Sequence, residues 1–395
     1  MTSVKTQLNW EQFKLNEIVQ LIYGEALPEQ KRVNGTIPVY GSNGIIGWHN
    51  EPLVKEQTIV VGRKGSVGKA NLTNNPCWVI DTAFYTELIS KELDIEYLFY
   101  FLSNLSTKLV YPKGVKPGIN RNEYLNNSVA LPVKNERIAL LEQQIIVKKI
   151  KSLFSEIDKA IEKVNIAISE ADNLFRSALN KKISSGFAEG WKEIPLINLT
   201  SFFNDGDWIE KRHQSSNEIR LIQTGNVGII DFRDKEEKRY INEETFNKLR
   251  CKDVLPGDIL ISRLPDPVGR ACIIPKLDDN RLITAVDCTI VRLEKGYIPE
   301  FINYLLNSRY AINQVHSFLS GSSRKRISRK NLEKIMLPIP MLNEKPDTEK
   351  QRLLVDELTK IRNLSMTLKD KYVKQLNLLE MMKQSLLNQA FQGKL

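Results

Sequence analysis

Apolar side chains recur at alternating intervals of three and four residues in two long stretches of this chain. Such a repeat places them along one stripe of an α-helix, the seam through which helices pair in a coiled coil. The stripes predict a long helix in each of the segments 134–187 and 342–395. Each helix is expected to cover somewhat more than ~40 residues and so to be roughly 60 to 70 Å long at the rise of an α-helix. The first stripe comprises Val147, Ile150, Phe154, Ile157, Ile161, Val164, Ile168, Ala171, Phe175 and Ala178. The second comprises Leu358, Ile361, Ser365, Leu368, Tyr372, Gln375, Leu379, Met382 and Leu386, two of which are polar.

The two segments that precede these helices, residues 1–133 and 188–341, have a different pattern. Short apolar or alternating runs are separated by Gly, Asn and Pro, which is typical of β-strands joined by turns. The clearest runs are QTIVVGRKG, CWVIDTAFYTEL, GDILISR and AVDCTIVRL. Short helices are expected at IEYLFYFLSN and PEFINYLLNS. The pattern predicts an α+β protein in which each of two mixed α/β domains is followed by a long helix.

The second half of the chain repeats the first. EQQIIVKKIKSLF, from Glu142, aligns without a gap on KQRLLVDELTKIR, from Lys350, and SALNKKISSGF aligns on SLLNQAFQGKL at the same offset. Identical pairs in the helices are Gln143/Gln351, Val147/Val355, Ser177/Ser385, Leu179/Leu387 and Asn180/Asn388. Weaker matches between the domains include Arg63/Arg263, Asp81/Asp287 and Tyr100/Tyr304. A chain that repeats about half its length has an internal two-fold plan.

Composition and charge narrow the functional class only slightly. At 395 residues, two or more domains are expected. The 57 Lys and Arg exceed the 47 Asp and Glu, and this net charge of +10 favours a polyanionic partner. Four Cys without a CxxC pair and three His indicate neither a zinc cluster nor a disulfide framework. Because neither a membrane-spanning run nor a signal peptide is recognisable, a soluble cytoplasmic protein is expected.

A family resemblance comes from the order and duplication of these elements. Proline-marked stretches, LPVKNER and LPIPMLNEKPDTEK, precede the two helices and are predicted as stops followed by polar loops. With the paired helix starts, the paired SALN and SLLN ends, and the turns PGDILISR and GRKGSVGKA, the chain resembles the specificity (S) subunits of type I restriction-modification enzymes. The resemblance covers nearly the whole chain.

The resemblance implies two target recognition domains, residues 1–133 and 188–341, held apart by an antiparallel pair of helices. In that family each domain reads one half of a bipartite double-stranded DNA sequence. The helices receive two methyltransferase (M) subunits, and the complex can recruit two restriction (R) subunits. A bacterial or archaeal cytoplasm is implied, and no catalytic residue, metal or cofactor belongs to this chain, since S-adenosylmethionine, ATP and Mg are expected on the partners. The longer second loop, NEKPDTEKQR against NERIALLEQQ, leaves open whether the two docking faces are equivalent.

DNA geometry independently favours such a plan. A major groove presents its face again every ~34 to 36 Å along the duplex, so a protein with two reading heads needs a stiff spacer of at least that order. Paired helices provide one. Because the two domains share only scattered residues, they are expected to read different half-sites, which gives an asymmetric target with an unread gap.

Basic loops are the first candidates for DNA contact. GSSRKRISRKNLEK is the densest positive run, and YPKGVKPGINRNEY occupies the matching position in the first domain. Such loops neutralise phosphates and release counterions. The alternative is a solvated loop before a helix; the duplication favours DNA. The predicted contacts are Arg324, Lys325, Arg326 and Arg329 in the second domain and Lys113, Lys116 and Arg121 in the first.

Two related turns are the second candidates. GRKGSVGKA contains Arg63, Lys64 and Lys69, and its counterpart SRLPDPVGRA contains Arg263 and Arg270. Arginine can read guanine through two parallel hydrogen bonds, so these residues are predicted to contact bases or phosphates. Plain β-turns whose glycines serve only backbone geometry are an equally good interpretation.

Two further loops complete the set of candidates. In YGSNGIIGWHN, Ser42 and Asn43 are predicted to reach DNA, while Trp48 is expected to be buried. In DGDWIEKRHQ, Lys211 and Arg212 are predicted phosphate contacts. Apolar residues beside the helix seams predict either partner helices or contact with the chain's own domains. They are Leu153, Leu174, Leu179, Leu354, Leu364 and Leu387.

Motifs of catalysis are not recognisable in the sequence. NNPCW lacks the second proline of an adenine-methyltransferase NPPY motif, GSVGKA does not fit a phosphate-binding loop, and KPDTEK does not fit a nuclease centre. The leading hypothesis is a non-catalytic DNA-recognition and assembly subunit. An operator-binding transcriptional regulator with an internal coiled coil is the alternative, and an enzyme with an unrecognised site is a third hypothesis.

Overall fold

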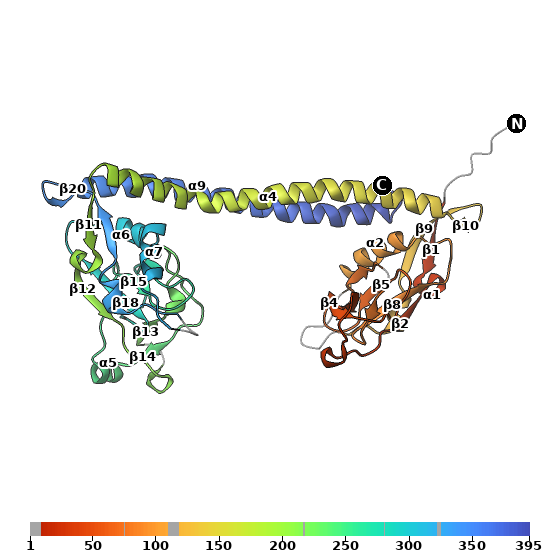
Figure 1. The fold of residues 1–395 in the computed structure, drawn as a ribbon, viewed down its shortest axis with the longest axis horizontal. Helices are drawn as coiled ribbons and strands as arrows, with labels where there is room; N and C mark the ends of the chain where they lie inside the picture. Colours follow the sequence, from red (N-terminus) through yellow and green to blue (C-terminus); the bar gives the residue numbers. More distant parts are fainter. Residues whose placement is uncertain (1–8, 75, 110–117, 216–217, 280, 322–324) are drawn as a thin grey trace. The chain divides into compact units, whose positions relative to one another are not determined.

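The computed structural model describes residues 9–74, 76–109, 118–215, 218–279, 281–321 and 325–395. The chain divides into two compact units. The N-terminal unit comprises Met1–Asn165 with Val373–Leu395, and the C-terminal unit is Ile166–Tyr372. Both long helices cross from one unit to the other, so each unit contains one globular segment and half of each helix (Figure 1).

The two predicted long helices are present as α4 (Leu140–Ala188, 49 residues) and α9 (Thr348–Ala390, 43 residues). Both begin six residues later than predicted, at 140 instead of 134 and at 348 instead of 342. The reason is a short β-hairpin before each helix, β9–β10 and β20–β21. Pro132 of LPV and Pro338 of LPIP lie inside strands β9 and β19, so their prediction as element stops was wrong, whereas Pro340 directly follows the end of β19.

The seam of the first helix is confirmed, since all ten predicted positions are buried or half-buried. In the second helix Leu358 and Ser365 are buried, whereas Gln375 and Met382 face solvent. Within the C-terminal unit the Ser365 hydroxyl donates to the carbonyl oxygen of Ala171 at 2.5 Å. Further pairs are Lys369–Asp172 and Lys182–Glu357 in the C-terminal unit and Lys383–Asp158 in the N-terminal unit. Residue numbers along α9 rise as those along α4 fall, so the helices are antiparallel.

The N-terminal unit contains three sheets in its described part. They have the strand orders β1-β9-β10, β2-β8-β5-β6 and β4-β3-β7. The strands are β1 (Asn9–Lys14), β2 (Val19–Tyr23), β3 (Ile37–Gly41), β4 (Gly44–His49), β5 (Ile59–Gly62), β6 (Ala70–Leu72), β7 (Trp78–Val79), β8 (Ala83–Leu88), β9 (Ser128–Lys134) and β10 (Arg137–Ile138). The short helices are α1 (Leu15–Ile18), the 3₁₀ turn η1 (Glu29–Lys31), α2 (Ile95–Ser106) and α3 (Arg121–Leu125).

The described part of the C-terminal unit contains four sheets. Their orders are β11-β19, β12-β18-β15-β16, β14-β13-β17 and β20-β21. The strands are β11 (Lys192–Pro195), β12 (Thr200–Asp205), β13 (Ile219–Ile222), β14 (Tyr240–Ile241), β15 (Ile259–Ser262), β16 (Ala271–Ile273), β17 (Leu282–Thr284), β18 (Cys288–Leu293), β19 (Met336–Ile339), β20 (Met341–Leu342) and β21 (Lys345–Pro346). The short helices are η2 (Leu196–Leu199), η3 (Lys211–His213), η4 (Thr224–Asn226), α5 (Glu243–Leu249), α6 (Pro299–Leu306), α7 (Arg309–Ser317) and α8 (Arg329–Leu332).

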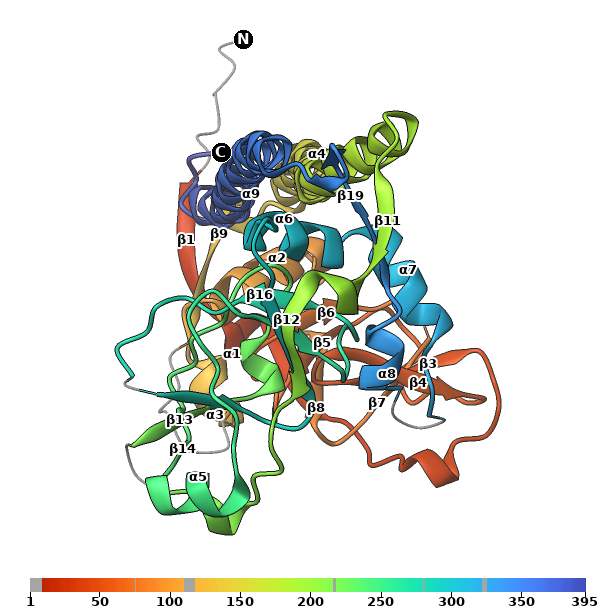
Figure 2. The same ribbon diagram turned by 90° about the vertical axis from the view of Figure 1, so that its left-hand side faces the viewer.

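The two units share one topology, which confirms the internal repeat. The antiparallel sheet β2-β8-β5-β6 corresponds to the antiparallel sheet β12-β18-β15-β16. The three-stranded sheet β4-β3-β7 corresponds to β14-β13-β17, and both of these contain one parallel pair, β3–β7 and β13–β17. The expected helices at IEYLFYFLSN and PEFINYLLNS are α2 and α6. In the C-terminal unit, α6 lies between the helix pair and the sheet strands in both views (Figures 1 and 2).

In each unit, the segments of α4 and α9 that belong to it form part of the hydrophobic core. In the N-terminal unit Leu387 and Phe391 of the α9 end join a cluster with Leu15 and Tyr97. In the C-terminal unit Leu179 and Leu354 join a comparable cluster. Three of the off-seam leucines are therefore buried by the chain's own domains. Leu153 is half-buried. Leu174 and Leu364 are 38% and 54% exposed, so these two of the six off-seam leucines are available to a partner helix.

Candidate nucleic-acid interface

The turn between β5 and β6 presents basic residues of the N-terminal unit. It is closed by hydrogen bonds from the Gly62 amide to the Lys69 carbonyl (2.9 Å) and from the Gly68 amide to the Gly62 carbonyl (2.8 Å). A Cβ at Gly62 would collide with the Ser66 carbonyl oxygen, so only glycine fits there. Outside this turn the Lys69 ammonium donates to the Asn43 side chain at 2.7 Å. Two residues predicted from separate loops are thus in contact.

Arg63 and Arg121, predicted from separate motifs, meet at a third residue. Their guanidinium carbons lie 5.0 and 5.5 Å from the centroid of the Tyr23 ring, at the end of β2. The backbone joins the same two segments, because the Ile119 amide donates to the Arg63 carbonyl at 3.0 Å. We call Tyr23, Arg63 and Arg121 the N-terminal corner. Tyr23 was missed in the sequence because nothing local distinguishes an exposed strand-end tyrosine.

The C-terminal unit builds a matching corner from Asp205, Arg263 and Arg329. The Ile327 amide donates to the Arg263 carbonyl at 3.3 Å, as in the first unit. An Arg329 guanidinium nitrogen donates to the Asn204 side-chain oxygen at 3.1 Å. Arg263 lies 3.4 Å from the Asp205 carboxylate. The same backbone frame therefore carries different side chains in the two units.

Comparison with known proteins identifies this duplicated fold. The sequence model of the type I restriction modification DNA specificity domain matches residues 7–168 and again 189–378. The chain belongs to this family. It is a DNA sequence-recognition subunit of a type I restriction-modification system, with two specificity domains.

Relatives in sequence are specificity subunits. The chain is 22% identical over 393 residues to the type I restriction enzyme MjaVIII specificity subunit of Methanocaldococcus jannaschii, covering 92% of this chain and 89% of the relative. It is 23% identical over 279 residues to a putative MjaX specificity subunit of the same organism, covering 67% and 62%. Neither relative is an operator-binding regulator.

Solved structures share the fold. One is a chain from work on complex assembly and conformational transition of the type I R-M system, with a TM-score of 0.68, 18% identity and coverage of 99% of this chain and 100% of that chain. Another is the HsdS subunit of Thermoanaerobacter tengcongensis, with a TM-score of 0.51, 18% identity and full coverage of both chains.

Two predicted contacts of this specificity subunit are buried and bonded to the chain's own backbone, and their contact with DNA stays a prediction. Arg263 and Arg270 are each only 5% exposed. Arg263 donates to the Val286 carbonyl at 2.6 Å. Arg270 donates to the carbonyl oxygens of Val227, Leu264, Pro267 and Thr224 at 2.6 to 2.9 Å. Burial lowers the pKa of Arg270. The turn sequence did not reveal this, because two of the four acceptors, the carbonyls of Thr224 and Val227, come from a loop more than 40 residues earlier.

The other predicted contacts divide by their surroundings. Lys64, Lys69, Lys211, Lys325 and Arg326 are exposed, and Ser42 is half-buried beside the β5–β6 turn. Arg212 is exposed but pairs with Glu210 at 2.8 Å. Lys113, Lys116 and Arg324 lie outside the described residues. The contacts of this group with DNA stay a prediction.

The environment predicted around Trp48 was wrong. Trp48 is 54% exposed, together with Ile45 (52%) on the same strand β4. His49 is instead buried, and its Nδ1 accepts from the Val33 amide at 3.0 Å. Trp48 and the next residue, His49, lie on opposite faces of the strand, and the sequence does not reveal which face is covered. The register shift between β3 and β4 at Val39/Tyr40 also interrupts the alternation. Trp208 is also exposed, at 69%.

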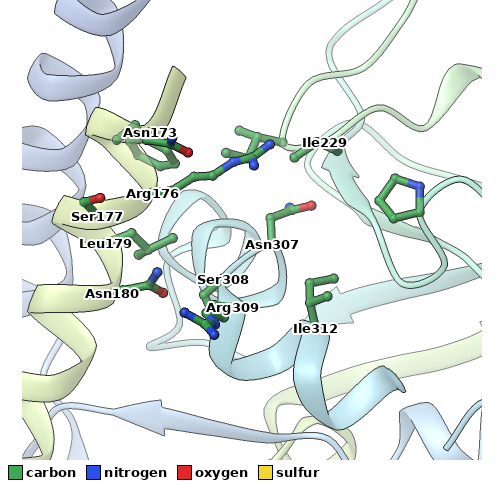
Figure 3. Close-up of a pocket in the computed structure, with 13 residues that line it drawn as sticks. Asn173, Arg176, Ser177, Leu179, Asn180, Ile229, Asn307, Ser308, Arg309 and Ile312 are labelled. Carbon is green, nitrogen blue, oxygen red and sulfur yellow. The ribbon is translucent and has the colours of Figure 1, made fainter. Parts of the chain in front are cut away.

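A cavity of about 440 Å³ lies between α4 and the α6–α7 junction of the C-terminal unit (Figure 3). Arg176 and Arg309 line it with asparagine, serine and apolar side chains, and no Asp, Glu, His or Cys is among the lining residues. At the matching place in the N-terminal unit, Asn104 hydrogen-bonds Asn388 and Gln384. The cavity thus offers hydrogen-bond donors but no general acid–base pair.

The described residues offer neither a metal site nor a membrane-spanning helix. They contain no group of three or more His, Cys, Asp or Glu that could hold a metal ion. Among the helices formed by these residues, none combines the length and apolar character needed to cross a bilayer.

Proposed function

We propose that this specificity subunit reads a split, asymmetric double-stranded DNA sequence, one half with each unit. The duplicated corner carries this proposal. Corresponding backbone frames carry Tyr23, Arg63 and Arg121 in one unit and Asp205, Arg263 and Arg329 in the other. Because base edges are distinguished by the donors and acceptors that meet them, unlike side chains on like frames favour unlike half-sites.

We further propose that two methyltransferase subunits dock at equivalent places on the long helices. Ile145 on α4 and Leu353 on α9 are related by the repeat, and they are 60% and 61% exposed. Each lies two residues after a repeated glutamine, Gln143 or Gln351, whose side chain is fully buried. Matching exposed apolar residues on a helix are what a partner helix covers. This supports two M subunits per chain, with two R subunits joining the assembled complex.

The proposed role of the chain is recognition and assembly without chemistry of its own. S-adenosylmethionine, ATP and Mg are then bound by the partners. Membership of a family of DNA specificity subunits supports this division of labour.

Co-expression with the methyltransferase encoded beside the gene tests the proposed function. Native mass measurement is expected to give two M subunits per chain, and methylation sequencing is expected to show one split, asymmetric motif. A chain that binds DNA alone and protects a palindrome would establish the regulator instead.

A further inference from the structure

We infer that the N-terminal corner is a preformed DNA-reading group in which Tyr23 positions Arg63 for a base edge and Arg121 for a phosphate. This rests on the proposed function, because it assigns part of one half-site to named residues. The three side chains come from the end of β2, the turn after β5 and the start of α3.

Tyr23 is held in place although its ring is exposed. Its ring packs edge-on against Phe84 in the sheet, with centroids 4.9 Å apart. The side chain is nevertheless 47% exposed, and both guanidinium groups lie over its ring. Stacking on an aromatic face restricts a guanidinium without neutralising its charge. The tyrosine therefore orders two cations at the protein surface.

Arg63 is restrained from both ends. Its guanidinium donates to the Asp81 carbonyl oxygen at 2.9 Å, and its own amide donates to the Thr82 carbonyl at 2.9 Å. Reading guanine requires a guanidinium fork at a fixed position and angle. A side chain anchored at the backbone, at one nitrogen and against a ring meets that requirement with little further loss of entropy.

Arg121 suits a different contact. It is the first residue of α3 and is exposed, so its guanidinium can follow a phosphate. The carboxylates that the structure describes form ion pairs with neither Arg121 nor Arg63, whose guanidinium hydrogen bond goes to a backbone carbonyl. Beside this corner a cavity of about 440 Å³ is lined by Arg121, Asn122 and Gln20, whose amides add donors and acceptors for base edges.

The C-terminal corner provides the internal comparison. Asp205 lies on β12 where Tyr23 lies on β2, because the amide of the glycine that follows each residue donates to the carbonyl of the residue just before its partner on the paired strand, Ala83 or Cys288. The neighbouring Asn204 accepts a hydrogen bond from Arg329. Arg263 is buried beside Asp205. Arg263 and Arg329 therefore have partners within the protein, which makes them less available to DNA. The exposed cationic reading group is thus a property of one half of the repeat, and we assign it to the half-site of the N-terminal unit.

Methylation sequencing of the full complex with its methyltransferase tests this assignment. Tyr23→Ala and Arg63→Ala are expected to relax the motif at the same base pair of one half-site and to weaken binding to the target about tenfold. Arg63→Lys, which keeps the charge but loses the fork, is expected to relax the same position. Tyr23→Phe is expected to retain the motif, whereas Tyr23→Asp, which copies Asp205, is expected to lose it.

Binding measured over a range of salt concentrations separates the two arginines. Arg121→Ala is expected to weaken target and non-target DNA alike and to reduce the slope of log affinity against log salt by about one. Lys91→Ala removes the same charge from an exposed lysine before α2 and is the matched control. Melting curves confirm that each variant is folded.

The outcomes distinguish this inference from the proposed function. A complex that marks a split motif, unchanged in Tyr23→Ala and Arg63→Ala, would overturn the reading group and leave the proposed function intact. Equal weakening of all DNA by Arg63→Ala would overturn its assignment to a base edge. A complex that marks no split motif would contradict the proposed function itself.

Discussion

Gln143 and Gln351 make the same two hydrogen bonds in the two units of the chain. The Gln143 side chain accepts from the Asp94 amide at 3.0 Å and donates to the Glu92 carbonyl at 2.9 Å, in the loop before α2. Gln351 does the same with backbone groups of the loop before α6, at 2.9 and 3.1 Å. Both glutamines are 0% exposed. A repeated glutamine thus joins each long helix to the domain that precedes it.

Replacing either glutamine is expected to destabilise only its own unit. Gln143→Ala leaves a part-buried amide and carbonyl without their partner, at a cost of about 1 to 3 kcal/mol each. Hydrogen exchange is expected to become faster at the Asp94 amide and to stay unchanged in the C-terminal unit.

The neighbouring Gln144 is exposed and provides the control. Gln144→Ala is expected to leave exchange at Asp94 unchanged. If Gln143→Ala also left it unchanged, the hydrogen bond would not restrain the loop.

Arg270 is expected to stabilise the C-terminal unit and not to contact DNA. Arg270→Met removes donors from four buried carbonyl oxygens, which is expected to cost about 3 kcal/mol or more. Urea denaturation followed by hydrogen exchange should show loss of stability around β15–β16. The salt dependence of DNA binding by the folded fraction is expected to match the wild type; a reduced slope would restore Arg270 as a phosphate contact.

Lys325 and Arg326 are expected to contribute charge without sequence preference. Both are exposed, and the backbone of Arg326 is bonded to Ser320. Changing both to Ala is expected to weaken binding to any duplex and to lower the salt slope by about two. Lys276 and Lys295 are exposed in the same unit and give a double variant of equal charge. A slope equal in the two double variants would refute a specific role for the Lys325–Arg326 loop.

The four cysteines are expected to make stability fall at alkaline pH. Burial raises the pKa of Cys77 and Cys251 to about 11 and of Cys272 and Cys288 to about 12, from an ordinary value of 9.0. The unfolded chain loses these thiol protons from pH 9 upward, whereas the folded chain retains them. Their contribution to stability is therefore complete below pH 9 and is lost as pH rises from 9 towards 12.

Melting temperatures between pH 8 and 10.5 check this expectation. Cys288→Ala is expected to be less stable at pH 8, because it leaves a cavity, but to lose less stability as pH rises. An identical pH dependence in wild type and variant would show that the thiol does not contribute. Thiol reagents are expected to label the native chain slowly at pH 8 and rapidly in denaturant.

Features set by local pattern were predictable from the sequence. The seam from Val147 to Ala178 is confirmed, because a helix period is written into consecutive residues. Alternating and apolar runs located β5, β15 and β18 for the same reason. The aligned pair Gln143 and Gln351 also predicted the shared architecture correctly.

Features set by distant residues were not predictable in the same way. Arg270 resembled a turn arginine until Val227 and Thr224, more than 40 residues earlier, supplied its acceptors. Arg63 and Arg121 were each recognised as basic, but their meeting at Tyr23 depends on strand order in the folded sheet. The corner is a tertiary arrangement, so its members are recognisable singly and their geometry is not.

The α9 end that completes the N-terminal core has a consequence for biosynthesis. Leu387 and Phe391 pack with Leu15 and Tyr97. The core of the N-terminal unit, most of which is translated first, is therefore incomplete until residue 391 has left the ribosome. The C-terminal unit consists of one contiguous segment, so it can fold on the nascent chain before the N-terminal unit is complete. Premature termination within α9 would yield a chain with a folded C-terminal unit and an N-terminal unit whose exposed core proteases can cleave.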